Sequence, residues 1–127
     1  MVTAKICGLS TPATLDAAVG GGASHVGLVF SPPSPRHVTF DQAAALAARV
    51  PAQTGKVGVF VDPEDALLDQ AIRAARLDAI QLHRVTPERA AAIGARTCLP
   101  VWAAVAVKAR ADLDAANAFR GAVQRLL

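Results

Sequence analysis

The sequence is poor in aromatic residues and has no concentrated patch of positive charge. Its 127 residues include four Phe, one Trp and no Tyr, and the net charge is only +3. Nucleic-acid-binding domains usually combine a basic stripe with aromatic side chains on which bases stack. This composition therefore predicts no nucleic-acid partner. A small anionic ligand suits the mild basic bias at least as well.

Cysteine is scarce too, since Cys7 and Cys98 are the only two. Two isolated cysteines form neither a disulfide framework nor a zinc motif, and we expect Cys98 to be an inert packing residue. The first ten residues lack the charged start and apolar core of a signal peptide. No apolar run approaches the roughly 20 residues of a transmembrane helix. We therefore expect a cytoplasmic protein with no membrane partner and no metal.

What the sequence does contain is a regular alternation of short apolar runs with alanine-rich stretches. The runs are nearly continuous in apolar residues, as expected of parallel strands that are buried on both faces. Thr11, Thr39 and Asp62 stand where three of the intervening helices should begin, and each is a good N-cap residue. The six apolar runs cover residues 4–7, 25–30, 56–61, 79–83, 101–107 and 122–127.

Repeated strand–helix units without hairpin turns predict an α/β protein with a parallel sheet. Two architectures remain open at this stage: an open, flavodoxin-like doubly wound sheet, and part of a (βα)8 barrel. A complete barrel needs about 200–250 residues, so 127 residues can supply only a piece of one. No Gly-x-Gly-x-x-Gly motif follows the first run, which argues against a dinucleotide-binding sheet.

The residues at the ends of the predicted strands offer several candidates for chemistry. Cys7 ends the first run, and it is either a small buried residue or a reactive group above a pocket. Lys5 and Cys7 have the same strand parity, as do Gln81 and His83 on the fourth run. His83 either satisfies the start of the next helix or contacts a ligand. Arg36 is either a solvated loop residue or an anion-binding group.

Four stretches together resemble one known family. They are "KICGLS" at 5–10, "VGLVFSPPSPRHV" at 26–38, "KVGVFVD" at 56–62 and "DAIQLH" at 78–83. In this order and spacing they resemble phosphoribosylanthranilate isomerase, the (βα)8-barrel enzyme of tryptophan biosynthesis. The resemblance implies a TIM-barrel family member, here an incomplete parallel barrel of five to six strands. Residues 1–127 would form a single partial barrel domain.

The resemblance also implies an activity and a set of roles. The family carries out the Amadori rearrangement of N-(5-phosphoribosyl)anthranilate, a phosphosugar joined to an aryl carboxylate, and it uses no cofactor. Cys7 matches the family's general base, and a thiol suits that role because it titrates near neutrality. Arg36 matches the residue that binds the anthranilate carboxylate. We expect His83, Gln81 and Lys5 to contribute to substrate binding.

Two further parts of the family's site are expected beyond the sixth run. They are the aspartate that acts as general acid and the late loops that bind phosphate in a barrel. An alternative prediction is therefore a catalytically incomplete barrel, which binds an anionic aromatic ligand or assembles with a partner chain. For either case we expect a homodimer or a complementing C-terminal segment, because an unclosed barrel exposes two strand edges.

Overall fold

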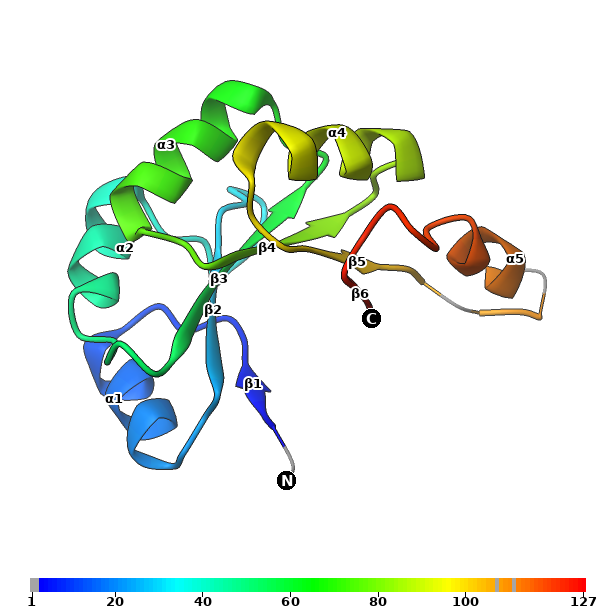
Figure 1. Ribbon diagram of the computed structural model, residues 1–127. Coiled ribbons are helices and arrows are strands. Elements are labelled where there is room, and N and C mark those ends of the chain that lie inside the picture. The colour runs from blue at the N-terminus through cyan, green and yellow to red at the C-terminus, as the bar shows by residue number, and fades with distance from the viewer. Residues whose placement is uncertain (1–2, 107, 111) are drawn as a thin grey trace.

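The structure is a computed structural model that describes residues 3–106, 108–110 and 112–127. Strands and helices alternate along these residues (Figure 1). In chain order the elements are β1 (Lys5–Ile6), α1 (Pro12–Gly20), β2 (His25–Val29), α2 (Phe40–Ala47), β3 (Gly55–Val61), α3 (Asp65–Ala75), β4 (Ala79–His83), α4 (Pro87–Thr97), β5 (Val101–Ala104), α5 (Asp112–Asn117) and β6 (Arg125–Leu126).

All the strands are parallel and lie side by side in sequence order, from β1 to β6. An open flavodoxin-like sheet would place β1 between β2 and β3, so this order excludes it. The sheet curves, and α1 to α4 cover its outer face (Figure 1). The predicted incomplete parallel barrel is thus confirmed as an open half-barrel. The assignment of residues 1–127 to one domain stays a prediction.

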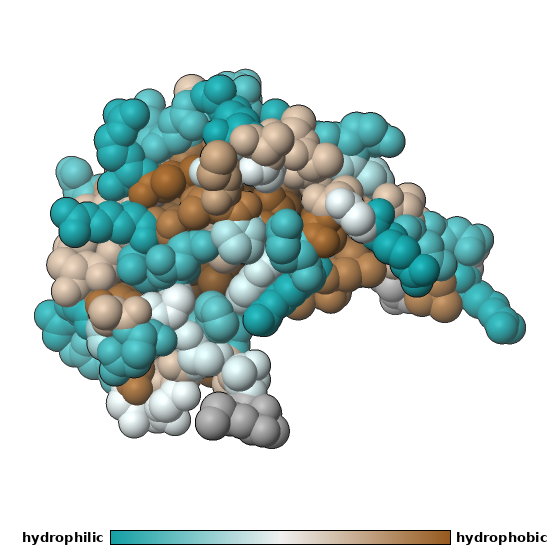
Figure 2. All heavy atoms as spheres, in the orientation of Figure 1, coloured by the Kyte–Doolittle hydropathy of each residue, from teal (hydrophilic) through white to brown (hydrophobic). Residues whose placement is uncertain are grey.

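Both faces of the central strands are buried, as their continuous apolar runs predicted. Alternate strand residues point outward and pack under the helices, where the Phe30 and Phe60 rings stack with centroids 5.3 Å apart. The intervening residues point into the concave face, where Val57, Ala79 and Trp102 form a second buried cluster. Figure 2 shows hydrophobic side chains gathered toward the middle of the molecule, with hydrophilic ones over the outer surfaces of the helices.

The predicted helix starts at Thr11 and Thr39 are confirmed. Each threonine side chain accepts a hydrogen bond from the backbone three residues on. The predicted cap at Asp62 is wrong, because α3 begins at Asp65 with Glu64 as its N-cap. Asp62 instead continues the sheet: its backbone N–H donates to the carbonyl of His83, at 3.0 Å, and its φ of 42° turns the chain.

The first strand and the last two strands are markedly shorter than the apolar runs that predicted them. The first, fifth and sixth runs form strands of two, four and two residues. Strands β1 and β6 each pair on one side only within the described residues, so fewer of their residues meet a partner. The predicted fifth strand included Val107, and the helix expected after it included Ala111. Both residues lie outside the described part of the chain.

The stacked pair under the helices generates a prediction about stability. Phe60 is fully buried, so Phe60→Ala removes a ring that the surrounding core cannot replace. We expect this change to lower the free energy of unfolding by about 3–5 kcal/mol, measured by urea denaturation. The control is Arg73→Ala on the exposed face of α3, expected to change stability by no more than about 0.5 kcal/mol. Equal effects of the two changes would contradict this packing.

Candidate active site

The end of β1 presents Lys5 and Cys7 to the concave face of the sheet. The backbone N–H groups of Gly8 and Leu9 donate to the carbonyl of Gly27 on β2, at 3.1 and 3.3 Å. Gly27 leaves the space that both side chains occupy. A Cβ at Gly27 would lie 3.0 Å from Cys7 Sγ and 3.2 Å from Lys5 Cε. The half-buried thiol is therefore held against the glycine of the neighbouring strand.

Arg36 reaches the same place from the loop that follows β2. Several hydrogen bonds shape this loop. Among them, Val38 N–H donates to the Val29 carbonyl, at 3.0 Å, and Arg36 N–H donates to Ser34 Oγ, at 3.2 Å. The arginine side chain then lies directly over Gly8, where a Cβ would come within 2.4 Å of Arg36 Cδ. Gly8 also has φ 77°, which favours glycine. The "KICG" and "SPR" motifs thus meet in space.

A second set of polar side chains crosses the concave face from β1 to β4. The Lys5 ammonium donates a hydrogen bond to Oε1 of Gln81. The other end of that amide, Nε2, lies 3.1 Å from Nε2 of His83. Gln81 is only 6% exposed, and Lys5 Nζ lies 5.8 Å from the centroid of the Trp102 ring, within cation–π range. Lys5 is therefore next to both Cys7 and the Gln81–His83 pair.

Burial and charge act together on the ionisable groups of this set. Burial lowers the pKa of the Lys5 ammonium, while the adjacent Cys7, through its charge and a hydrogen bond, acts in the opposite direction. Burial is also the main cause that lowers the pKa of the His83 imidazole below its usual 6.5, and the positive charges of Lys5 and Arg84 lower it further. Both effects therefore favour the neutral form of the His83 imidazole.

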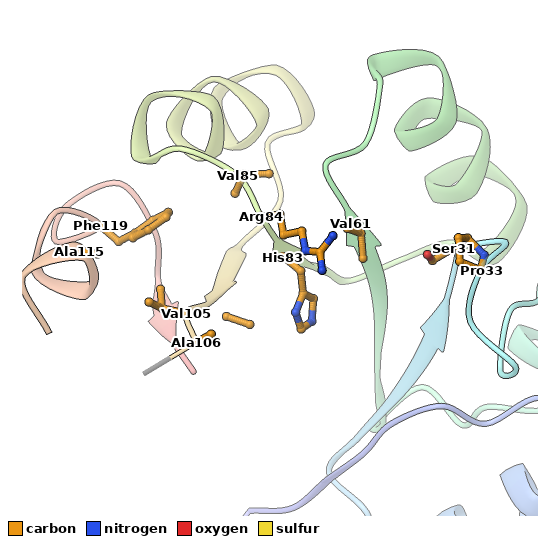
Figure 3. A pocket seen from close by; sticks show the side chains of 11 residues that line it. Ser31, Pro33, Val61, His83, Arg84, Val85, Val105, Ala106, Ala115 and Phe119 are labelled. Atoms are coloured by element: carbon orange, nitrogen blue, oxygen red, sulfur yellow. The ribbon is translucent and has the colours of Figure 1, made fainter. Parts of the chain in front are cut away.

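A cavity of about 620 Å³ opens beside His83, at the carboxyl ends of the strands. Its walls are mostly apolar, and Figure 3 shows the His83 and Arg84 side chains between Val61 on one side and Val105 on the other. Such a cavity suits an apolar ring that carries a negative charge. The lining residues are Ser31, Pro33, Val61, His83, Arg84, Val85, Ala104, Val105, Ala106, Ala115 and Phe119.

The structure places the five predicted site residues on one face, in two connected groups. Arg36 lies over Gly8, the residue after Cys7, and Lys5 connects Cys7 to Gln81 and His83. Only His83 of the five lines the large cavity. Cys98 is free and exposed at the C-terminal end of α4, so its predicted packing role is wrong.

Sequence reasoning missed Trp102 and Arg84. The signal for Trp102 was its register, because it pairs with Gln81 across β4 and β5 and so shares the concave face. Arg84 directly follows His83 with φ 57°, a left-handed conformation that is uncommon for residues other than glycine. This conformation turns the chain out of β4 beside the cavity, which the sequence pattern alone did not indicate.

The described residues hold neither a cluster of metal ligands nor a helix that could span a membrane. In residues 3–106, 108–110 and 112–127, no group of three or more His, Cys, Asp and Glu residues is placed to hold a metal ion. The helices of that same part of the chain include none with the length and apolar character needed to cross a bilayer. The absence of a cofactor stays a prediction.

Comparison with known sequences gives a consistent result. The profile of a family described as N-(5′-phosphoribosyl)anthranilate (PRA) isomerase matches residues 4–127. The chain is 49% identical over 127 residues to the isomerase of that name from Paramagnetospirillum magneticum, covering 99% of this chain and 59% of the relative. It is 56% identical over 115 residues to the one from Paracoccus denitrificans, covering 90% and 54%. The chain thus spans little more than half the length of these relatives.

Solved structures show the same similarity in three dimensions. One is of mutually generated monomers of the dimeric phosphoribosylanthranilate isomerase from Thermotoga maritima. It matches with a TM-score of 0.89 and 32% identity, over 99% of this chain and 63% of that one. Another is a phosphoribosylanthranilate isomerase in complex with reduced 1-(o-carboxyphenylamino)-1-deoxyribulose 5-phosphate. It matches with a TM-score of 0.89 and 32% identity, over 95% and 62%.

The surroundings of His83 generate a prediction about its titration. Two cations, Lys5 and Arg84, disfavour the imidazolium form. Arg84→Gln removes one of them and leaves the burial of the ring unchanged, so the pKa of His83 should rise while staying below 6.5. Nuclear magnetic resonance during a pH titration measures this change. His25, whose pKa is lowered mainly by its own burial, serves as the internal reference. A His83 pKa that stays the same or falls in the variant would contradict the description.

Proposed function

The chain belongs to the N-(5′-phosphoribosyl)anthranilate isomerase family, and from this membership we propose that the whole protein catalyses the family's reaction. That reaction is the Amadori rearrangement of N-(5-phosphoribosyl)anthranilate, an aminoaldose, into the corresponding 1-amino-1-deoxyketose. The double bond moves by transfer of a proton from one sugar carbon, so the site needs a base near that carbon and an anchor that holds the substrate in place.

One observation supports this function above all others, namely the position of the Arg36 side chain over Gly8, the residue that follows Cys7. Gly27 makes room for the thiol, with Sγ 3.0 Å from the position a Cβ would take, and Gly8 makes room for the guanidinium. A proton acceptor, Cys7, and an anion-binding group, Arg36, therefore lie at the same carboxyl end of β1, the end at which barrel enzymes bind their substrates.

The roles follow from the chemistry of each group. Cys7 accepts the proton from the sugar carbon next to the reacting one, acting as the general base. Arg36 binds the aryl carboxylate, because a guanidinium donates two parallel hydrogen bonds to a carboxylate. His83 binds the substrate from β4, on the side of the large cavity.

The proton donor and the phosphate-binding groups are assigned to the part of the barrel beyond β6. In the family the proton donor follows this strand and the phosphate is bound by later loops. The edge residues Ile6 on β1 and Leu126 on β6 are 42% and 46% exposed, which supports a complementing C-terminal segment that covers them. The assembly we assign is a homodimer, as the name of the Thermotoga maritima structure describes for that relative.

Replacement of the proposed base tests this function in the whole protein. Cys7→Ala leaves the strand intact but removes the proton acceptor, so kcat should fall by at least about 100-fold. The assay follows conversion of N-(5′-phosphoribosyl)anthranilate to the ketose. The matched control is Cys98→Ala, which removes an exposed thiol on α4 and should leave kcat unchanged. Comparable activity in the two variants would sink the assignment of Cys7.

A further inference from the structure

The contact between Lys5 and Gln81 fixes the orientation of a buried amide. An ammonium group has three N–H donors and no acceptor. The atom of Gln81 that faces Lys5 Nζ must therefore be the carbonyl oxygen, as the structure has it. Lys5 reaches this oxygen from β1 across the concave face of the curved sheet (Figure 1), although β2 and β3 stand between β1 and β4 in the strand order.

The orientation of the amide in turn determines which nitrogen of His83 carries the proton. With its oxygen on Lys5, Gln81 presents its NH₂ group to His83 Nε2, at 3.1 Å. An NH₂ group only donates, so Nε2 must accept, and the proton of a neutral imidazole then resides on Nδ1. The charge on Lys5 therefore determines the direction of both hydrogen bonds, from Lys5 to Gln81 and from Gln81 to His83.

Burial makes this arrangement costly to change. Gln81 is 6% exposed, so water has little access to an amide turned the wrong way. A reversed amide would place its NH₂ group against the ammonium and leave its oxygen against the ring. A buried polar group that loses its hydrogen-bond partner destabilises the folded protein. The surrounding charges, Lys5 on β1 and Arg84 next to His83, both favour a neutral ring.

We propose that Lys5 and Gln81 are positioning residues that hold His83 as the neutral tautomer with its proton on Nδ1. In the described part of the chain Nδ1 of His83 has no hydrogen-bond partner, and His83 lines the large cavity. His83 therefore presents a hydrogen-bond donor to an oxygen atom of the bound phosphosugar. This last step rests on the proposed function, whereas the tautomer itself does not.

The proposal revises the expected role of Gln81. The sequence pattern placed Gln81 among the substrate-binding residues, but both ends of its amide are engaged, by Lys5 and by His83. Gln81 therefore acts on the substrate through His83. Lys5 also has two neighbours, because it contacts Gln81 and lies beside Cys7. One cation thus orients the proposed hydrogen-bond donor and sits next to the proposed base.

The test reads the tautomer directly, in the whole protein labelled with ¹⁵N-histidine. At a pH above the titration of His83, nuclear magnetic resonance should show a protonated Nδ1 and an unprotonated Nε2 in the unmodified protein. A proton on Nε2 would overturn the proposal. This measurement needs no substitution, so it decides the question even where a variant fails to fold.

Gln81→Glu provides the matched change. The introduced carboxylate has nearly the same shape but only accepts hydrogen bonds, so it still binds Lys5 and now requires a proton on His83 Nε2. We expect the tautomer to reverse and kcat/KM to fall about 10-fold or more, because the donor to the substrate is lost. The control is Gln70→Glu on the exposed side of α3, which introduces the same charge change elsewhere. It should alter neither the His83 tautomer nor kcat/KM. An unchanged tautomer in Gln81→Glu would overturn the proposal.

The two readouts separate this proposal from the proposed function. An unmodified protein with the proton on Nδ1 but without isomerase activity would contradict the function and leave the positioning of His83 standing. Isomerase activity together with a proton on Nε2 would support the function and overturn the positioning. Gln81→Glu that reverses the tautomer while kcat/KM stays unchanged would also overturn the catalytic consequence drawn here.

Discussion

The contact between Lys5 and Gln81 depends on the curvature of the sheet. Strands paired in sequence order, each followed by a helix on the same side, twist and curve into a barrel wall. Only such a wall brings a side chain of β1 to one of β4 when two strands stand between them. A flat sheet would keep these two side chains apart. Lys5 would then no longer connect Cys7 to the Gln81–His83 pair.

Two glycines make the site at the end of β1 possible. Gly27 leaves space on the concave face for Cys7 and Lys5, and Gly8 lets Arg36 lie against the backbone. A side chain at either position would occupy the space that a functional group now fills. The positions of the thiol and the guanidinium therefore depend as much on these small residues as on the loops that carry them.

The strand–helix alternation could be predicted from the sequence because buried parallel strands are continuous in apolar residues and helices begin at capping threonines. The parity of Lys5 with Cys7, and of Gln81 with His83, predicted that each pair shares one face of the sheet. The choice between an open sheet and a barrel needed the strand order or the family resemblance, because local patterns do not encode how strands pair.

Other features depend on tertiary contacts that no local pattern shows. The Asp62 cap failed because the backbone of Asp62 pairs with the end of β4, which delays the start of α3. Likewise, the inward position of Trp102 follows from the register of β4 and β5, in which Trp102 pairs with Gln81. The link between Lys5 and Gln81 is a contact between residues 76 positions apart, which one sequence alone does not reveal.

The central claim is that Cys7, Arg36 and His83 contact the same molecule, and a crystal structure of the whole protein with the reduced carboxyphenylamino-deoxyribulose phosphate tests it most directly. The account predicts the aryl carboxylate on the Arg36 guanidinium, the sugar carbons beside Cys7 Sγ and a ligand oxygen within hydrogen-bond distance of His83 Nδ1. A ligand bound with its carboxylate away from Arg36 and its sugar away from Cys7 would contradict it.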